Sequence, residues 1–164
     1  MSLKELRNSI RREFLEYKRR LEELTARREH LQSQKNEFQK YLEEIKKGAP
    51  FHRIKEIARK LRVTAPDPFI SKLALLVHIR ESLKKINEEL QNIGDELASI
   101  ERCLKEGIEC PLCNGTGYLT KTRIVRGDII QEVLESRKCP LCRGVGKLFY
   151  DQIMHDDEMI SKYP

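Results

Sequence analysis

The chain of 164 residues is 35% charged, 39% hydrophobic and 6% aromatic, contains no tryptophan, and carries a formal net charge of +6. So few aromatic side chains beside so much charge disfavour a single compact globule and favour elongated helices. The sequence has no run of about 18 apolar residues and no charged-then-apolar leader, so we expect no membrane contact and a cytoplasmic location.

Residues 3–47 are predicted to form one long helix, because apolar side chains recur every seven residues along them. The main row consists of Leu3, Ile10, Tyr17, Leu24, Leu31, Phe38 and Ile45. A second row of Phe14, Leu21 and Leu42 is interrupted by Arg28 and Lys35. These charges are expected to weaken the middle of the seam or to snorkel to its rim. Gly48 and Pro50 end the helix.

Residues 48–68 are expected to form the tip of a helical hairpin. The apolar residues with the spacing of a short amphipathic capping helix are Ile54, Ile57, Ala58 and Leu61. Residues 54–64 and 69–73 also resemble the first helix and turn of helix-turn-helix DNA-binding proteins. Arg62 stands where that family usually has glycine, and Pro66 and Pro68 crowd the start of the recognition helix. The capping helix is therefore the favoured interpretation.

Residues 69–106 are predicted to form a second long helix that ends at Gly107. Its two rows are Leu76, Leu83, Leu90, Leu97 and Leu104, and Ile79, Ile86, Ile93 and Ile100. Two long helices joined by a short tip favour an antiparallel coiled-coil hairpin over residues 1–107. The alternative is pairing between copies of the chain in a homo-oligomer.

A cysteine motif occurs twice, as Cys110-Pro-Leu-Cys113-Asn-Gly115-Thr-Gly117 and as Cys139-Pro-Leu-Cys142-Arg-Gly144-Val-Gly146. The glycines allow the positive φ angles of a tight metal-binding knuckle. The four cysteines are predicted to bind one Zn²⁺ per chain in a tetrahedral site with no open position. The alternatives are a disulfide pair, a redox C-x-x-C motif and a rubredoxin-like iron site.

Residues 108–150 are predicted to form a small β-hairpin module around this metal. Mixed apolar and polar runs at 118–125 and 129–137 flank Arg126-Gly127-Asp128, which we interpret as a turn. A segment of about 40 residues buries too little apolar surface to fold alone, so zinc would supply folding free energy. Residues 151–164 are expected to form a solvated acidic tail, in which His155 is a candidate extra ligand.

The duplicated C-x-x-C-x-G-x-G motif resembles the cysteine-rich zinc domain of the DnaJ co-chaperones over residues 110–147. Those domains contain four such motifs and two zinc ions, whereas this chain has two motifs and no His-Pro-Asp tripeptide. The resemblance implies a half-domain that binds zinc and contacts proteins outside a chaperone cycle. The layout is also similar to that of the secondary-channel regulators of bacterial RNA polymerase related to the DnaK suppressor. Their hairpin tips are acidic, whereas this tip is mostly basic.

Basic residues outnumber acidic ones in residues 1–65, which suits either pairing with an acidic helix or phosphate binding. The sequence offers no recognisable catalytic constellation, so we expect no enzyme. The favoured hypothesis is a zinc-binding coiled-coil adaptor or regulator that contacts a larger protein machine through its tip and zinc module. The alternative is a nucleic-acid-binding protein that uses the basic N-terminal half or the cations Arg123, Arg126, Arg137, Lys138 and Arg143. A third hypothesis is a redox protein that uses the C-x-x-C thiols.

Overall fold

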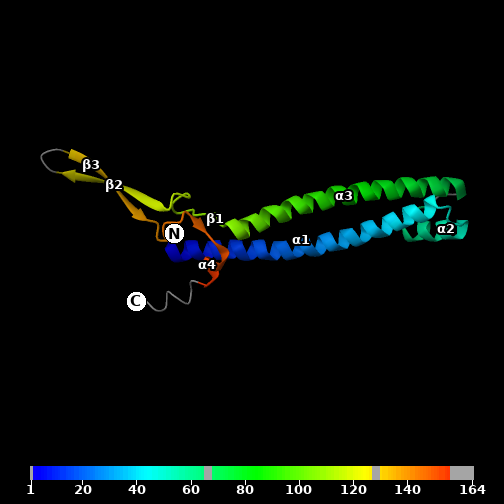
Figure 1. The fold of residues 1–164 in the computed structure, drawn as a ribbon, viewed down its shortest axis with the longest axis horizontal. Helices are drawn as coiled ribbons and strands as arrows, with labels where there is room; N and C mark the ends of the chain where they lie inside the picture. Colours follow the sequence, from blue (N-terminus) through cyan, green and yellow to red (C-terminus); the bar gives the residue numbers. More distant parts are fainter. Residues whose placement is uncertain (1, 65–67, 127–129, 156–164) are drawn as a thin grey trace. The chain divides into compact units, whose positions relative to one another are not determined.

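The computed structural model describes residues 2–64, 68–126 and 130–155, with side chains at all of these except 68–71 and 122–134. The helices are α1 (Leu3–Lys46), α2 (Phe51–Lys60), α3 (Pro68–Glu106) and α4 (Tyr150–His155), as Figure 1 shows. Short antiparallel strands follow α3 and form a small β module. The predicted fold class, a mostly α chain with a helical hairpin followed by a β module, is confirmed.

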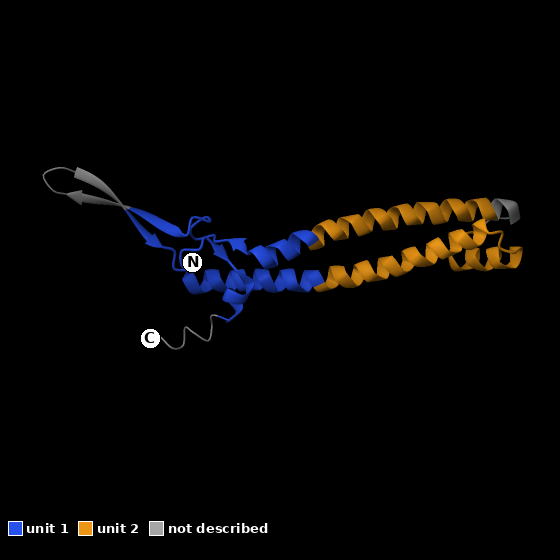
Figure 2. Ribbon diagram, viewed as in Figure 1, with its two compact units in different colours: residues 1–21, 98–164 blue, residues 22–97 orange. Residues whose placement is uncertain are grey.

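The chain divides into two compact units, coloured separately in Figure 2. Unit 1 contains residues 1–21 and 98–164, and unit 2 contains residues 22–97. The division therefore falls inside α1 and α3, whereas the sequence suggested a boundary at residue 107. Unit 1 combines the first turns of α1 and the last turns of α3 with the whole β module, because they share one apolar core.

Unit 2 is a helical hairpin closed by α2. The predicted short amphipathic helix is present, since α2 buries Ile54, Ile57 and Ala58. Its fully buried neighbours are Ile45 of α1 with Leu75 and Ile79 of α3, which belong to the same core cluster. Three helices meet at this end, so each needs a wider apolar face than a two-helix seam requires. This explains why Leu75 and Tyr41 are buried although neither belongs to the predicted sevenfold rows.

The two predicted rows of α3 are buried to different extents. The four isoleucines Ile79, Ile86, Ile93 and Ile100 are buried, whereas Leu97 alone is buried in the leucine row. Leu76, Leu83, Leu90 and Leu104 are half-buried. The isoleucine row therefore carries most of the packing between the long helices.

A cleft of about 750 Å³ opens between α1 and α3 within unit 2. Arg28 and Lys35 line it from α1, and Leu90 lines it from α3 together with the amides of Asn87 and Gln91. Burying an unpaired charge is costly, so cations at seam positions keep their head groups toward water. Arg28 is accordingly exposed and Lys35 half-buried, and Leu90 loses an apolar neighbour as a result.

An ion-pair network fixes α2 to α1. The Arg53 guanidinium donates from Nε to Glu44 Oε2 of α1 at 2.8 Å and from Nη1 to Glu56 Oε2 of α2 at 2.8 Å. Arg53 and Glu44 are half-buried, being 30% and 27% exposed, so water screens this pair less than a surface pair. The hydrogen bond from Arg53 lowers the pKa of both carboxyl groups.

Two tyrosine phenols are expected to ionise at a higher pH than an ordinary tyrosine. The hydroxyls of Tyr17 and Tyr41 donate to Glu13 and Glu37, one turn earlier in α1. These hydrogen bonds, followed by burial, raise the pKa of both phenols to about 12. Because the folded-state pKa is raised, their contribution to stability is complete below about pH 10 and is lost as the pH rises through 12.

Absorbance at an ultraviolet wavelength specific for tyrosinate can follow this titration. Tyr41→Phe should remove one late-ionising phenol, and Glu37→Gln should return Tyr41 toward its ordinary pKa. A Tyr41 that ionises near pH 10 in the folded wild-type chain would contradict the hydrogen bond to Glu37.

Candidate metal centre

The β module of unit 1 contains two pairs of antiparallel strands. β1 (Ile108–Glu109) pairs with β4 (Lys147–Leu148), and β2 (Tyr118–Arg126) pairs with β3 (Ile130–Lys138). The predicted hairpin is therefore present, with each strand close to its expected limits. Of its predicted turn, Arg126 ends β2, and residues 127 and 128 lie outside the described residues.

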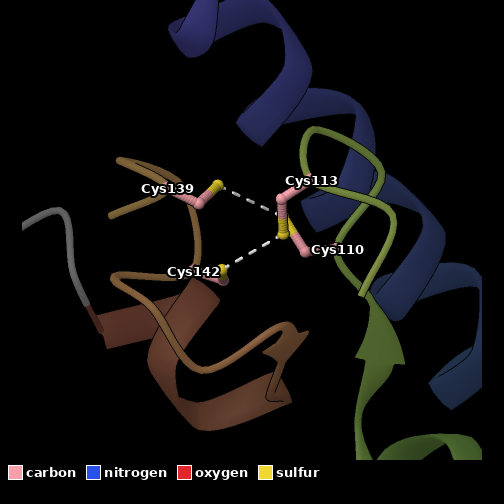
Figure 3. A group of neighbouring side chains, drawn as sticks. All are labelled: Cys110, Cys113, Cys139 and Cys142. Carbon is pink, nitrogen blue, oxygen red and sulfur yellow. Dashed lines mark hydrogen bonds between the residues drawn. The ribbon is translucent and has the colours of Figure 1, made fainter. Parts of the chain in front are cut away.

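The structure brings together the four cysteines that the sequence proposed as ligands, as Figure 3 shows. All four are buried, and all four Sγ atoms lie within 4.8 Å of one another. Cys110 Sγ is 3.7 Å from Cys139 Sγ, and Cys113 Sγ is 3.6 Å from Cys142 Sγ. A tetrahedral ion with metal–sulfur bonds of about 2.3 Å places its ligands about 3.8 Å apart, so the cluster fits such an ion.

The two knuckles hold each other through backbone hydrogen bonds. The Cys110 N–H donates to the Gly146 carbonyl at 2.9 Å, and the Cys139 N–H donates to the Gly117 carbonyl at 2.8 Å. Within each knuckle a glycine N–H donates to a sulfur at 3.2 Å, from Gly117 to Cys113 and from Gly146 to Cys142. The duplicated motif thus folds into two equivalent halves that fix the four sulfurs.

The glycines of the two knuckles differ in what a side chain would meet. A Cβ at Gly146 would lie 2.1 Å from the Gly115 carbonyl oxygen of the other knuckle, and φ there is +81°. At Gly144 φ is +95°, and the nearest atoms are those of the Lys138 side chain at 3.6 Å. Glycine is therefore required at Gly146 by close approach, and at Gly144 by backbone conformation alone.

Alanine at these two positions should separate the two requirements. Gly144→Ala should cost about 1–2 kcal/mol, because a left-handed backbone strains any side chain. Gly146→Ala adds a collision between backbones and should abolish metal retention. Metal content after purification and the thermal midpoint of unfolding measure both effects. Equal retention of metal by the two variants would contradict the close approach of the knuckles.

Thiol acidity differs across the cluster. Burial raises the pKa of Cys110 to about 12. At Cys142 burial is outweighed by the N–H groups of Gly146 and Gly144, which bring the pKa down to about 7. Metal ligands must be thiolates, so the N–H donors around Cys142 already favour the form that binds.

The cysteine cluster packs directly against the first turns of α1. Ile10 and Phe14 belong to the same buried cluster as the four cysteines, Leu148 and Ile153. The rings of Phe14 and Tyr150 meet edge to face with centroids 5.9 Å apart, and Lys18 Nζ lies 5.4 Å from the Tyr150 centroid. The cysteine cluster therefore forms part of the core of unit 1.

Sequence reasoning missed α4, which begins at Tyr150 and buries Ile153. Residues 151–155 of the expected solvated tail belong to this helix, and residues 156–164 lie outside the described part of the chain. His155 is exposed and is not a member of the four-cysteine group. Apolar residues at 148, 150 and 153 were the available signal, but six residues are too few for a helical period to stand out.

Comparisons with protein-family models, with curated proteins and with solved structures found no match. None of the helices in the described ranges combines the length and apolarity that a membrane span requires. The fold and the site together define a module with four clustered cysteines that could hold a metal ion, packed with the ends of two long helices.

Proposed function

We propose that this chain is a zinc-binding adaptor or regulator without catalytic activity, which contacts a larger protein assembly through its helical tip and its metal module. The observation that carries the proposal is the set of four buried sulfurs within 4.8 Å of one another. Four thiolates complete a tetrahedral shell and leave no position for water or substrate, which is typical of structural zinc. The resemblance to the DnaJ zinc domain, limited to residues 110–147, also favours zinc and a role in protein contact.

The charge arrangement supports a protein partner over a nucleic acid. Arg27 of α1 forms an ion pair with Glu89 of α3, and Arg53 is bound by two carboxylates. Arg19 likewise pairs with Glu16. Part of the positive excess of the N-terminal half is therefore neutralised within the protein, which reduces its value for tracking phosphates.

Affinity purification of the tagged, full-length, zinc-loaded protein from its native cells, with and without nuclease, tests the proposal. We expect a protein partner that remains after nuclease treatment and is lost when Cys139→Ser disrupts the module. The matched control is Cys103→Ser, because Cys103 lies outside the metal cluster. If partners are recovered only without nuclease treatment, the adaptor proposal is wrong and nucleic-acid binding is the better assignment.

A further inference from the structure

The cleft between α1 and α3 in unit 2 is walled by two stripes of polar positions. Each stripe is spaced by four and then three residues, so it follows one face of its helix. The stripes are Arg28, Gln32 and Lys35 on α1, and Asn87, Gln91 and Gly94 on α3. The cleft volume of about 750 Å³ lies within the range of small-molecule sites.

The two flanks of the interface between α1 and α3 differ. On one flank Arg27 of α1 forms an ion pair with Glu89 of α3. Successive residues are about 100° apart around a helix, so Arg27 and Arg28 lie on opposite sides of the buried Leu31. By the same spacing, Glu89 and Leu90 lie on opposite sides of the buried row of isoleucines. The cleft therefore occupies the flank opposite the Arg27–Glu89 pair.

The cations of the cleft face amides instead of carboxylates. Arg28 and Lys35 come from α1, and α3 presents Asn87 and Gln91 across from them. An amide can form hydrogen bonds, but it does not neutralise a cation. Within the described ranges, neither Arg28 nor Lys35 forms an ion pair. The cleft is thus left open between the helices with two positive charges at its wall.

Two described acids lie close to these cations. Glu29 lines the cleft, and Asp95 accepts a hydrogen bond from Gln91 Nε2 at 3.1 Å. Further acids, at positions 67, 128 and 156–158, lie outside the described residues. If one of them occupied the cleft cations, the full-length chain would fail to bind an added anion.

Gly94 leaves free space along the wall of the cleft. Glycine in the interior of a helix is less stable than alanine, so its presence there usually has a packing or conformational reason. Neither reason applies to Gly94, because it lies inside α3 and a Cβ built on it would meet nothing within 4 Å. The glycine therefore lowers helix stability and gives open volume in return.

We propose that this cleft binds a small organic oxyanion that carries two anionic groups, phosphate or carboxylate. Arg28 and Lys35 are two turns apart, about 10 Å along α1, so two separate anionic groups suit them. Guanidinium and ammonium groups bind both kinds of oxyanion, and the amides offer donors and acceptors to the part of the ligand between them. Such a ligand adds a small-molecule input to the protein, and the inference does not depend on the adaptor function.

Nitrogen-15 NMR of the full-length, zinc-loaded protein tests the site with two flexible probes, 1,6-hexanediol bisphosphate and octanedioate. We expect saturable shifts of backbone amides that are concentrated in residues 28–35 and 87–94. The probe that binds more tightly identifies phosphate or carboxylate as the preferred group. Hexyl phosphate, which has one anionic group, should bind about fivefold more weakly than the bisphosphate. Metal quantification before and after titration checks that the probes remove no metal.

The double variant Arg28→Gln with Lys35→Gln should weaken binding about tenfold or more, since two exposed charge pairs each contribute modestly. The matched control is Arg59→Gln with Lys85→Gln, which removes one exposed arginine and one exposed lysine of unit 2 outside the cleft. Both variants have the same net charge, so a general attraction of anions would fall equally in both. The control should bind the probes as the wild type does.

Gly94→Glu separates ligand binding from stability. It brings a carboxylate into the cleft that holds Arg28 and Lys35, and it replaces glycine by a better helix former. The thermal midpoint of unit 2 should therefore rise while the affinity for the probes falls about tenfold. Gly94→Ala should also raise the midpoint and should retain more of the affinity, because it adds no charge.

Three results would overturn the inference. One is the absence of saturable binding of either probe to the full-length protein. Another is a set of shifts that lies outside residues 28–35 and 87–94, and the third is equal weakening of binding in the two double variants. A nuclease-resistant protein partner that the Arg28→Gln, Lys35→Gln variant still captures would leave the adaptor function standing in each of these cases.

Discussion

Removal of the metal from the intact protein is expected to unfold unit 1 and to leave the helices of unit 2 in place. The binding free energy of structural zinc is folding free energy, on the order of 10–16 kcal/mol, which equals or exceeds the total stability of a typical domain. Because Ile10 and Phe14 pack against the cysteines, the loss should extend into the first turns of α1. Hydrogen exchange should accelerate on the order of a hundredfold or more in residues 2–21 and 98–155, and little in residues 22–64.

Cys139→Ser should reproduce the effect of a chelator, and Cys103→Ser should not, since Cys103 lies outside the cluster of Sγ atoms. Far-ultraviolet circular dichroism should therefore fall only partly on metal removal. Unchanged exchange in residues 2–21 after chelation would refute the shared core between α1 and the metal module. Loss of the whole helical signal would refute the independence of unit 2.

Ile79→Ala should destabilise unit 2 by about 2–5 kcal/mol, the usual cost of truncating a fully buried isoleucine. Ile79 is completely buried in the cluster where α1, α2 and α3 meet. Leu90→Ala is the control, because Leu90 stands in the predicted leucine row but lines the cleft and is half-buried. Its truncation should cost about 1 kcal/mol, since much of its surface already contacts water.

Urea unfolding followed by circular dichroism, with zinc present, compares the two variants. The proposed zinc is expected to keep unit 1 folded, so the difference in midpoint should report on unit 2. An equal or greater loss of stability in Leu90→Ala would show that the leucine row, and not the isoleucine row, holds the helices together.

The long helices and the metal ligands could be predicted because each depends on a local, repeated signal. The sevenfold rows define α1 and α3, and the stop at Gly48 and Pro50 places the end of α1 within one residue of Lys46. The duplicated motif selected the four cysteines that the structure brings together. The hairpin strands followed from the two mixed apolar and polar runs between the knuckles.

The remaining features depend on contacts between segments far apart in sequence. Nothing local indicates that Phe14 faces Tyr150, so the common core of α1 and the metal module could not be predicted. Burial of Tyr41 and Leu75 requires a third helix at the closed end, and the sevenfold rows describe a seam between two. Arg53 pairs with Glu44 of α1 and with Glu56 of α2. Its ion pair with Glu44 could not be predicted from the sequence, because it requires α2 to fold back onto α1.

X-ray absorption at the metal edge of the freshly purified, full-length protein tests the account most directly, together with metal quantification. We expect one zinc per chain surrounded by four sulfurs at about 2.3 Å, with no nitrogen or oxygen ligand. Cys142→Ser should lose the metal or replace one sulfur by a lighter ligand, which assigns the signal to this cluster. A protein that contains no metal and has its four cysteines in disulfides, or a zinc ion with an open position filled by water, would contradict the proposed structural zinc site.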